Sequence, residues 1–231
     1  MKSSIVSLVV ALGAFLATGC GGGGGGGGSQ DSAPRGIRIL HGSIDATPLD
    51  IYSTSVPGAV VQRGGFAAVQ KYAELREGPQ TITVTRAKNP SAAVRSFNVE
   101  VGSRQRYSLV LFGDSREFGL STRLLDDTLP EDRGSGALLR VVDAMTGAAE
   151  ITVSAGEFSA PRGSNVTAKV PYGGASPYLE VPAGTLRITT QRSADSKVVS
   201  AITADLLPGE AYTLLVGGEA DYYVKSSLFE D

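Results

Sequence analysis

The sequence predicts an all-β chain that contains two similar units in tandem, and three observations support this. Residues 37–130 align with residues 137–231 from end to end. Short runs of strand-forming residues recur roughly every 8–12 residues, with Gly or Pro between them. No segment of the sequence keeps a sustained helical period of apolar residues. A repeat of this length that is rich in short strands predicts two β-sandwich domains.

The first 19 residues have the three parts of a secretory signal peptide. Lys2 supplies a positive charge, residues 5–16 are mostly apolar, and Ala17, Thr18 and Gly19 are small. The apolar run is shorter than the roughly 20 residues that a membrane-spanning helix needs. We therefore expect residues 1–19 to be removed on export.

Cys20 follows directly and is the only cysteine of the chain. With the small residues before it, it resembles the lipobox of bacterial lipoproteins, although Leu16 stands one position earlier than the usual leucine. The resemblance implies that Cys20 becomes the mature N-terminus and carries acyl chains such as palmitate, which partition into the lipid bilayer. A plain signal peptide followed by a free cysteine is the alternative.

Residues 20–35 predict a flexible tether, because eight consecutive glycines occupy positions 21–28. As a random coil, such a segment spans on the order of 20–25 Å. Gly21 stands where, by resemblance to enterobacterial lipoproteins, an aspartate would retain the protein in the inner membrane. We therefore expect an exported, lipid-anchored protein of the outer membrane of a Gram-negative bacterium.

Composition narrows the classes of partner and cofactor. The chain has 21 Lys and Arg against 23 Asp and Glu, a net charge of −2. No basic field is present to attract nucleic acid, so we expect no nucleic-acid partner. With Cys20 acylated, no disulfide can form. Nothing in the sequence predicts a cofactor.

The two predicted sandwiches span residues 36–129 and 137–231, and residues 130–136 form an acidic linker. Residues 81–85 and 186–189 alternate polar and apolar side chains, as half-buried strands do. Residues 107–112 and 212–216 are apolar apart from Ser108 and Thr213, which predicts central strands that are covered on both faces.

Tyr212 follows the turn Leu-Pro-Gly-Glu-Ala at residues 207–211. This sequence resembles the turn into the sixth strand of immunoglobulin-like and fibronectin-type domains. There, a tyrosine hydroxyl bonds back to the preceding loop in a tyrosine corner. Tyr107 follows a weaker copy of the turn, so we expect immunoglobulin-like sandwiches. The alternative is that both tyrosines only favour strand formation.

The first unit opens with His-Gly-Ser-Ile-Asp-Ala-Thr-Pro-Leu-Asp-Ile-Tyr at residues 41–52, and Val-Pro-Ala-Gly occurs at residues 181–184. These segments resemble the bacterial domain of unknown function 4397 family, whose opening is of the type His-Ala-Ser-Pro-Asp-Ala-Pro-x-Val-Asp-Val-Tyr. The resemblance covers nearly all of residues 37–231 and implies tandem domains in an exported protein. Ile44 and Thr47 replace prolines of the motif, and Asp143 stands at the place of His41 in the second unit.

His41, Asp45 and Asp50 are the candidate binding residues of the opening motif. A histidine near carboxylates could act as a general base or bind a metal ion. A structural role is favoured, because Asp45 falls in a turn where it can cap backbone amides. One histidine cannot supply the usual zinc ligands, so we expect no metal. Ser43 could complete a triad, but no Gly-x-Ser-x-Gly elbow is present.

Two further segments leave alternatives open. Asp126, Asp127, Glu131 and Asp132 between the units could bind calcium through hard oxygen ligands, or could form a solvated linker. The longer loop of the second unit, residues 156–177, could carry recognition residues or could be a variable connection without a role.

These observations predict a non-enzymatic binding or structural module in the cell envelope, whose partner is an envelope polymer or a surface protein. One alternative is an exported hydrolase or metal-dependent enzyme that uses His41, Asp45 and Asp50. Another is a carbohydrate-binding module, which the lack of tryptophan disfavours and the eight tyrosines leave open.

Overall fold

The computed structural model describes residues 35–68, 70–114, 119–131, 133–157 and 166–231. The predicted signal peptide, Cys20 and most of the tether lie outside these ranges, as does the tip of the longer loop of the second unit. The described residues belong to one compact unit. Within them, no helix is long and apolar enough to cross a membrane.

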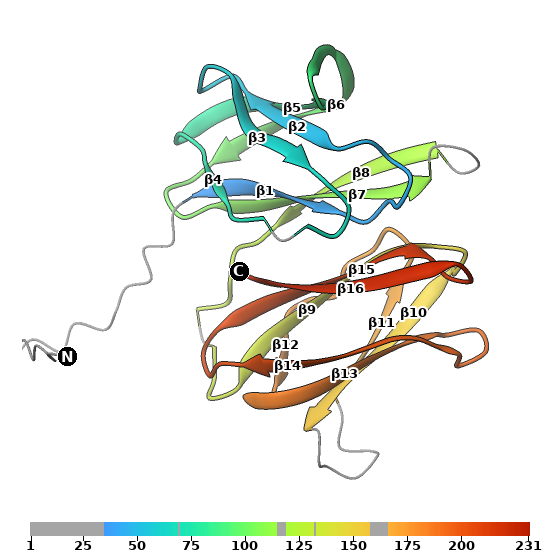
Figure 1. Cartoon of the computed structure of the whole chain (residues 1–231). Coiled ribbons are helices and arrows are strands. Elements are labelled where there is room, and N and C mark those ends of the chain that lie inside the picture. Colours follow the sequence, from blue (N-terminus) through green and yellow to red (C-terminus); the bar gives the residue numbers. More distant parts are fainter. Residues whose placement is uncertain (1–34, 69, 115–118, 132, 158–165) are drawn as a thin grey trace, which may run out of the picture. The chain divides into compact units, whose positions relative to one another are not determined.

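Each predicted unit forms a sandwich of two four-stranded sheets, so the prediction of an all-β tandem fold is confirmed (Figure 1). The strands of the first sandwich are β1 (Gly36–His41), β2 (Leu49–Ser53), β3 (Ala59–Gly64), β4 (Ala73–Glu74), β5 (Gly78–Arg86), β6 (Asn89–Val101), β7 (Arg106–Asp114) and β8 (Gly119–Asp126). Those of the second are β9 (Ala137–Thr146), β10 (Glu150–Glu157), β11 (Val166–Pro171), β12 (Leu179–Val181), β13 (Gly184–Arg192), β14 (Val198–Leu206), β15 (Ala211–Glu219) and β16 (Tyr223–Glu230).

The strand order is the same in both sandwiches. Sheet A has the order β4-β1-β7-β8 and sheet B the order β3-β2-β5-β6, while sheet C (β12-β9-β15-β16) and sheet D (β11-β10-β13-β14) repeat them. The first strand of each unit pairs in parallel with the seventh, and the other neighbours are antiparallel. This eight-stranded order differs from the seven-stranded ABED and CFG sheets of immunoglobulin constant domains. The duplication therefore extends to sheet topology.

The core of each sandwich lies between its two sheets. Strand β5 alternates as predicted, because Ile82 and Val84 are fully buried and face the first core. In β13, Leu186 and Ile188 face the second core in the same way. The period-2 pattern of the sequence thus identified the inward faces of both strands.

Strands β7 and β15 are buried on both faces, which confirms the prediction for residues 107–112 and 212–216. One face of each strand packs on the core of its own sandwich, and the other face is covered by the other unit. A third apolar cluster joins sheet A to sheet C there. Its members come from both sheets: Leu40, Val110, Leu125, Val142, Ala144, Leu215 and Phe229. The sheets therefore follow the order B, A, C, D, and the two sandwiches share a buried apolar interface.

Glycine at two positions lets sheets A and C approach closely. The amide of Gly218 donates to the carbonyl oxygen of Gly42 at 2.9 Å. A Cβ atom on Gly217 would lie 2.8 Å from the Cα atom of Gly42, and one on Gly42 would lie 2.2 Å from the Cβ atom of Ala144. No side chain fits at either glycine without separating the two units.

The tyrosine corners are present in both units. The hydroxyl of Tyr107 donates to the carbonyl oxygen of Glu100 at 3.0 Å, and that of Tyr212 accepts from the amide of Leu207 at 3.0 Å. Both tyrosines lie at the start of the seventh strand of their unit rather than the sixth. The hydrogen bonds confirm the predicted contact, and the strand order explains the changed position.

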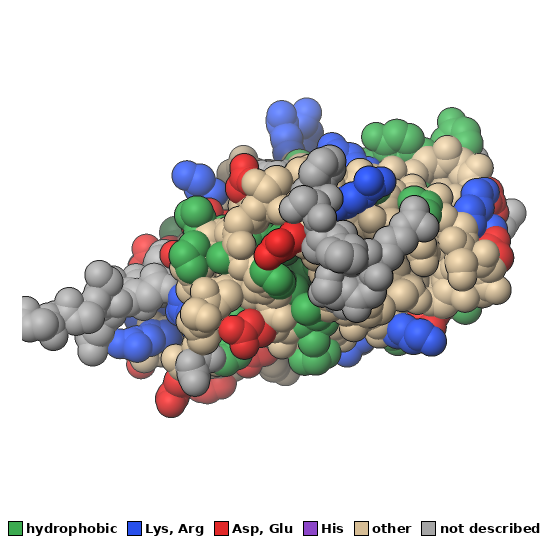
Figure 2. All heavy atoms as spheres, turned by 90° about the horizontal axis from the view of Figure 1, so that it is seen from below, with side chains coloured by type: hydrophobic (Ala, Val, Ile, Leu, Met, Phe, Trp, Pro, Cys, Tyr) green, Lys and Arg blue, Asp and Glu red, His purple; other side chains and the backbone are tan. Residues whose placement is uncertain are grey.

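Sheets B and D carry polar, mostly uncharged outer faces. Thr81 pairs with Asn98 on sheet B, and Thr185 pairs with Asp205 on sheet D. Figure 2 views the molecule from below, where β13 and β14 lie in Figure 1, and its surface is largely tan with scattered blue and red side chains. No broad area of one charge is visible on this face.

Candidate functional site

His41 lies at the end of β1 and faces the core of the first sandwich. Its side chain is 1% exposed, and Nε2 lies 3.4 Å from the carbonyl oxygen of Thr47. Since a carbonyl only accepts, Nε2 carries the proton and Nδ1 is an acceptor, which has no partner among the described residues. Burial lowers the pKa of His41 more than the hydrogen bond to Thr47 raises it, so the ring is neutral at pH 7.

Ser43 and Asp45 lie in the turn after β1. The Ser43 hydroxyl donates to Oδ1 of Asp45 at 3.1 Å. Because a serine has one hydroxyl proton, this bond directs it to the carboxylate and not to the imidazole of His41. This bond between two side chains holds the turn, and the capping of backbone amides by Asp45 stays a prediction.

The carboxylate of Asp50 binds the backbone at a strained position in β3 and at another in the β5–β6 turn. Its Oδ1 accepts from the amide of Arg63 at 2.8 Å and its Oδ2 accepts from the amide of Lys88 at 2.9 Å. Arg63 and Lys88 both have positive φ angles, 52° and 63°, which residues other than glycine rarely adopt. Both oxygens of the carboxylate are therefore committed to backbone amides.

Replacing Asp50 should destabilise the first sandwich. Asp50→Ala removes two hydrogen bonds to a charged acceptor and leaves two left-handed residues without support, so we expect a loss of about 2–3 kcal/mol in the free energy of unfolding. Asp50→Asn keeps one acceptor oxygen and should lose less. Urea denaturation of both variants measures this, and an unchanged midpoint for Asp50→Ala would contradict the role.

The structure does not gather the three predicted candidates into one reactive cluster. His41 bonds to Thr47, Asp45 bonds to Ser43, and Asp50 bonds to the amides of β3 and of the β5–β6 turn. Among the described residues, no group of three or more His, Cys, Asp and Glu side chains is placed to hold a metal ion.

Asp143 occupies the position of His41 in the second unit, as the alignment predicts. His41 pairs with Leu111 of β7, and Asp143 pairs with Val216 of β15 at the matching place. Asp143 is fully buried, and its Oδ1 accepts from the amide of Met145 at 2.9 Å. Its Oδ2 has no partner in the described part of the chain. Burial raises the pKa of Asp143 to about 7, against a smaller lowering by the Met145 amide.

The main polar cluster joins the two sandwiches, and we call it the reciprocal arginine network. Arg38 of the first unit forms a salt bridge with Asp231 of the second, and its Nη1 donates to the carbonyl oxygen of Glu230 at 3.0 Å. Arg140 of the second unit forms a salt bridge of 2.5 Å with Asp127 of the first. All four side chains are at most 5% exposed.

Each carboxylate of this network is also held within its own unit. Asp127 accepts from the hydroxyl of Ser108 at 2.5 Å and from that of Tyr72 at 2.7 Å. Asp231 accepts from Thr213 at 2.6 Å and from Tyr178 at 2.9 Å. The guanidinium groups lie over rings of their own unit. The carbon of Arg38 is 4.5 Å from the centroid of Tyr72, and that of Arg140 is 4.8 Å from the centroid of Tyr178.

The surroundings of the network shift the pKa values of Arg140 and of both tyrosines. Burial is the largest single influence on Arg140 and would lower its pKa, but the electrostatic interactions with Asp127, Tyr178 and Asp231 together outweigh burial and raise it. Burial, followed by the charge of Asp127, raises the pKa of Tyr72. Burial and the charge of Asp231 raise that of Tyr178, so both phenols stay protonated hydrogen-bond donors. Such a network fixes the register in which the two sandwiches pair.

The network corrects the prediction of a solvated or calcium-binding segment at Asp127. This side chain is 2% exposed and its oxygens are occupied by Arg140, Ser108 and Tyr72. Asp126 is exposed and accepts from the amide of Thr128 at 2.9 Å. The sequence showed a signal for the network: Tyr72 matches Tyr178, and the aspartates after β8 and β16 match each other. The partner arginines could not be assigned without the tertiary structure.

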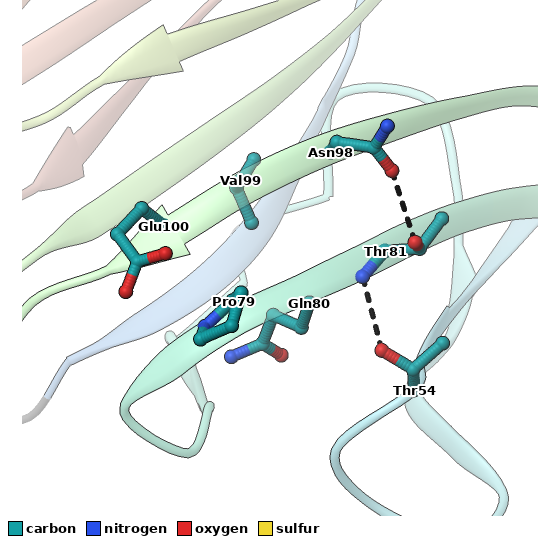
Figure 3. A pocket seen from close by; sticks show the side chains of 7 residues that line it. All are labelled: Thr54, Pro79, Gln80, Thr81, Asn98, Val99 and Glu100. Atoms are coloured by element: carbon teal, nitrogen blue, oxygen red, sulfur yellow. Dashed lines mark hydrogen bonds between the residues drawn. The ribbon is translucent and has the colours of Figure 1, made fainter.

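A shallow depression of about 430 Å³ lies on sheet B beside the start of β5 (Figure 3). Its lining consists of Thr54, Pro79, Gln80, Thr81, Asn98, Val99 and Glu100. The amide of Thr81 donates to Thr54 at 3.0 Å and its hydroxyl donates to Asn98 at 3.0 Å. Gln80 donates to the carbonyl oxygen of Arg76 at 2.5 Å. These polar groups already have hydrogen-bond partners, so the depression offers few groups to a ligand.

Comparison with known proteins gives the family. The profile described as a domain of unknown function (DUF4397) matches residues 35–154 and residues 137–231. The chain belongs to this family. The second match covers the second sandwich, and the first covers the first sandwich and continues into β9 and β10. The predicted tandem pair of DUF4397 domains is confirmed. No curated protein matches the chain.

Proposed function

We propose that this DUF4397 protein is a lipid-anchored, non-enzymatic binding or structural module of the bacterial cell envelope. In this proposal, acylated Cys20 holds the protein to the membrane, and the glycine-rich tether sets the distance between the membrane and the paired sandwiches. The partner is an envelope polymer or a surface protein.

The strongest support for this proposal is that both carboxylate oxygens of Asp50 accept hydrogen bonds from backbone amides. A carboxylate that acts as a general base needs a free oxygen that faces the substrate, and one that binds a metal ion needs a free oxygen that faces the ion. Both oxygens of Asp50 are instead within 2.9 Å of backbone amides that they support. The opening motif of the family then serves to build the first sandwich.

The pairing of the sandwiches supports a role in display. The third apolar cluster and the two buried salt bridges join sheets A and C over their facing surfaces. A rigid pair presents the outer sheets and loops in a constant geometry, which suits a module that binds without changing its partner.

Substitution of the anchor tests the proposal. Cys20→Ala should release the protein from the membrane fraction, because no thiol remains to accept a diacylglycerol. Cys20→Ser keeps the approximate size of the side chain but lacks the thiol, so this variant should also be released from the membrane fraction. Palmitate labelling and membrane fractionation measure this, and equal labelling of wild type and Cys20→Ala would refute the anchor.

A further inference from the structure

We infer that an aromatic ledge made of Phe66, Tyr222 and Tyr223 binds a polysaccharide chain of the cell envelope. The inference rests on the proposed function, since it names the ligand class of the binding module. It starts from the exposure of two rings: Tyr222 is 80% exposed and Tyr223 is 48% exposed. Exposed large rings cost hydration free energy, which a ligand that covers them recovers.

The ledge lies where the two sandwiches meet. Tyr222 and Tyr223 close the β15–β16 hairpin, in which Glu219 pairs with Tyr223. The Tyr223 ring packs on Phe66 of the β3–β4 loop, with centroids 6.1 Å apart and planes inclined by 56°. Ser227 on the same strand donates to the carbonyl oxygen of Ala67 at 3.2 Å and fixes this loop. Two of the rings are therefore held in place before any ligand binds.

Charged hydrogen-bonding groups lie next to the rings. Asp221, adjacent to Tyr222, accepts from Arg192 at 3.0 Å and from Lys197 at 3.0 Å. Hydrogen bonds from Lys197 and Arg192 lower the pKa of Asp221, so it stays ionised. Its side chain is 65% exposed, which leaves lone pairs free for further donors. Sugar hydroxyls donate well to such a carboxylate, while the C–H faces of pyranose rings pack on aromatic faces.

Packing between the units accounts for the contact of Phe66 with Tyr223 but not for Tyr222. In the matching loop of the second unit, Tyr172 packs on Phe112 of the first unit, with centroids 5.5 Å apart. An aromatic contact between the units therefore lies on both sides of the pair. The Tyr222 ring is 80% exposed, so most of its surface serves no such contact.

The size of the ledge favours a sugar polymer over a folded protein. A stable protein interface buries about 800 Å² on each partner, and three rings with a charged border supply much less. The net charge of −2 gives no attraction for a nucleic acid. A polysaccharide needs contact with only one or two sugar rings at a time, and repetition along the chain raises the avidity.

Calorimetric titration of the full chain in detergent with three soluble glycans, chitohexaose, cellohexaose and maltohexaose, tests the inference. We expect saturable binding of at least one of them. Tyr222→Ala should weaken that binding at least tenfold, and because Tyr222 is 80% exposed the fold should be kept. Tyr223→Ala should have a similar effect, whereas Tyr223→Phe keeps the ring and should bind within threefold of wild type.

Leu207→Ala is the matched control, because Leu207 is 59% exposed and lies after β14, away from the hairpin. It should bind as wild type does. Absence of heat with all three glycans, or equal affinity of wild type and Tyr222→Ala, would overturn the inference. Sedimentation that shows a dimer lost in Tyr222→Ala would assign the ledge to a second copy and also overturn it. Membrane fractionation of the Cys20 variants reports separately on the proposed function.

Discussion

Asp127→Ala is expected to lower the free energy of unfolding by about 3–5 kcal/mol, because it leaves the buried Arg140 without a counter-ion. The variant also removes the acceptor of the Tyr72 and Ser108 hydroxyls. Since Arg140 belongs to the other unit, both sandwiches should lose stability together. Guanidinium denaturation followed by circular dichroism measures the loss.

Asp126→Ala is the matched control for Asp127→Ala. Asp126 is the exposed neighbour, and its side chain accepts hydrogen bonds at the surface from Thr128 and Gln105. We expect this variant to stay within about 0.5 kcal/mol of wild type. If both variants lost the same stability, the effect would come from the segment and not from the network. Asp231→Ala should reproduce the effect of Asp127→Ala through Arg38.

Asp143→Asn is expected to stabilise the protein at pH 8 and to have little effect at pH 4. The folded-state pKa of Asp143 is about 7, above the ordinary value of 3.8 for an aspartate. The folded protein therefore binds the proton more tightly than the unfolded chain does. Ionisation then costs stability progressively as the pH rises from about 4 to 7. With 1.36 kcal/mol per pKa unit, the full cost above pH 7 is about 4 kcal/mol.

Asparagine removes this cost while Oδ1 can still accept from the Met145 amide. Urea denaturation of wild type and variant at pH 4, 6 and 8 should show a difference that grows with pH. His41 has the opposite pH dependence, because its lowered pKa costs stability as the pH falls below about 6.5. His41 is present in both wild type and Asp143→Asn, so its contribution cancels in the difference between them. Asp205→Asn on the outer face of sheet D controls for the loss of one charge. A difference independent of pH would contradict a buried, titrating Asp143.

Sequence patterns predicted much of the fold and little of the site. Alternation at Ile82 and Val84 identified an inward face because the side-chain period of a strand is two. The apolar run that starts at Tyr107 predicted a strand covered on both faces, but a run of this kind does not say what covers it. The equivalence of Asp143 and His41 was visible in the alignment. Its consequence for titration was not, since a pKa depends on burial and on partners from other strands.

The duplication, the all-β class and membership in the DUF4397 family follow from the amino-acid sequence, because these depend on local periodicity and on residue order. The pairing of the sandwiches through sheets A and C, the salt bridge of Arg38 with Asp231 and the contact of Phe66 with Tyr223 are evident only in the folded structure. The last two contacts join residues more than 150 positions apart, and the energies of all three depend on distance and burial in the folded chain. No pattern within a single strand encodes them.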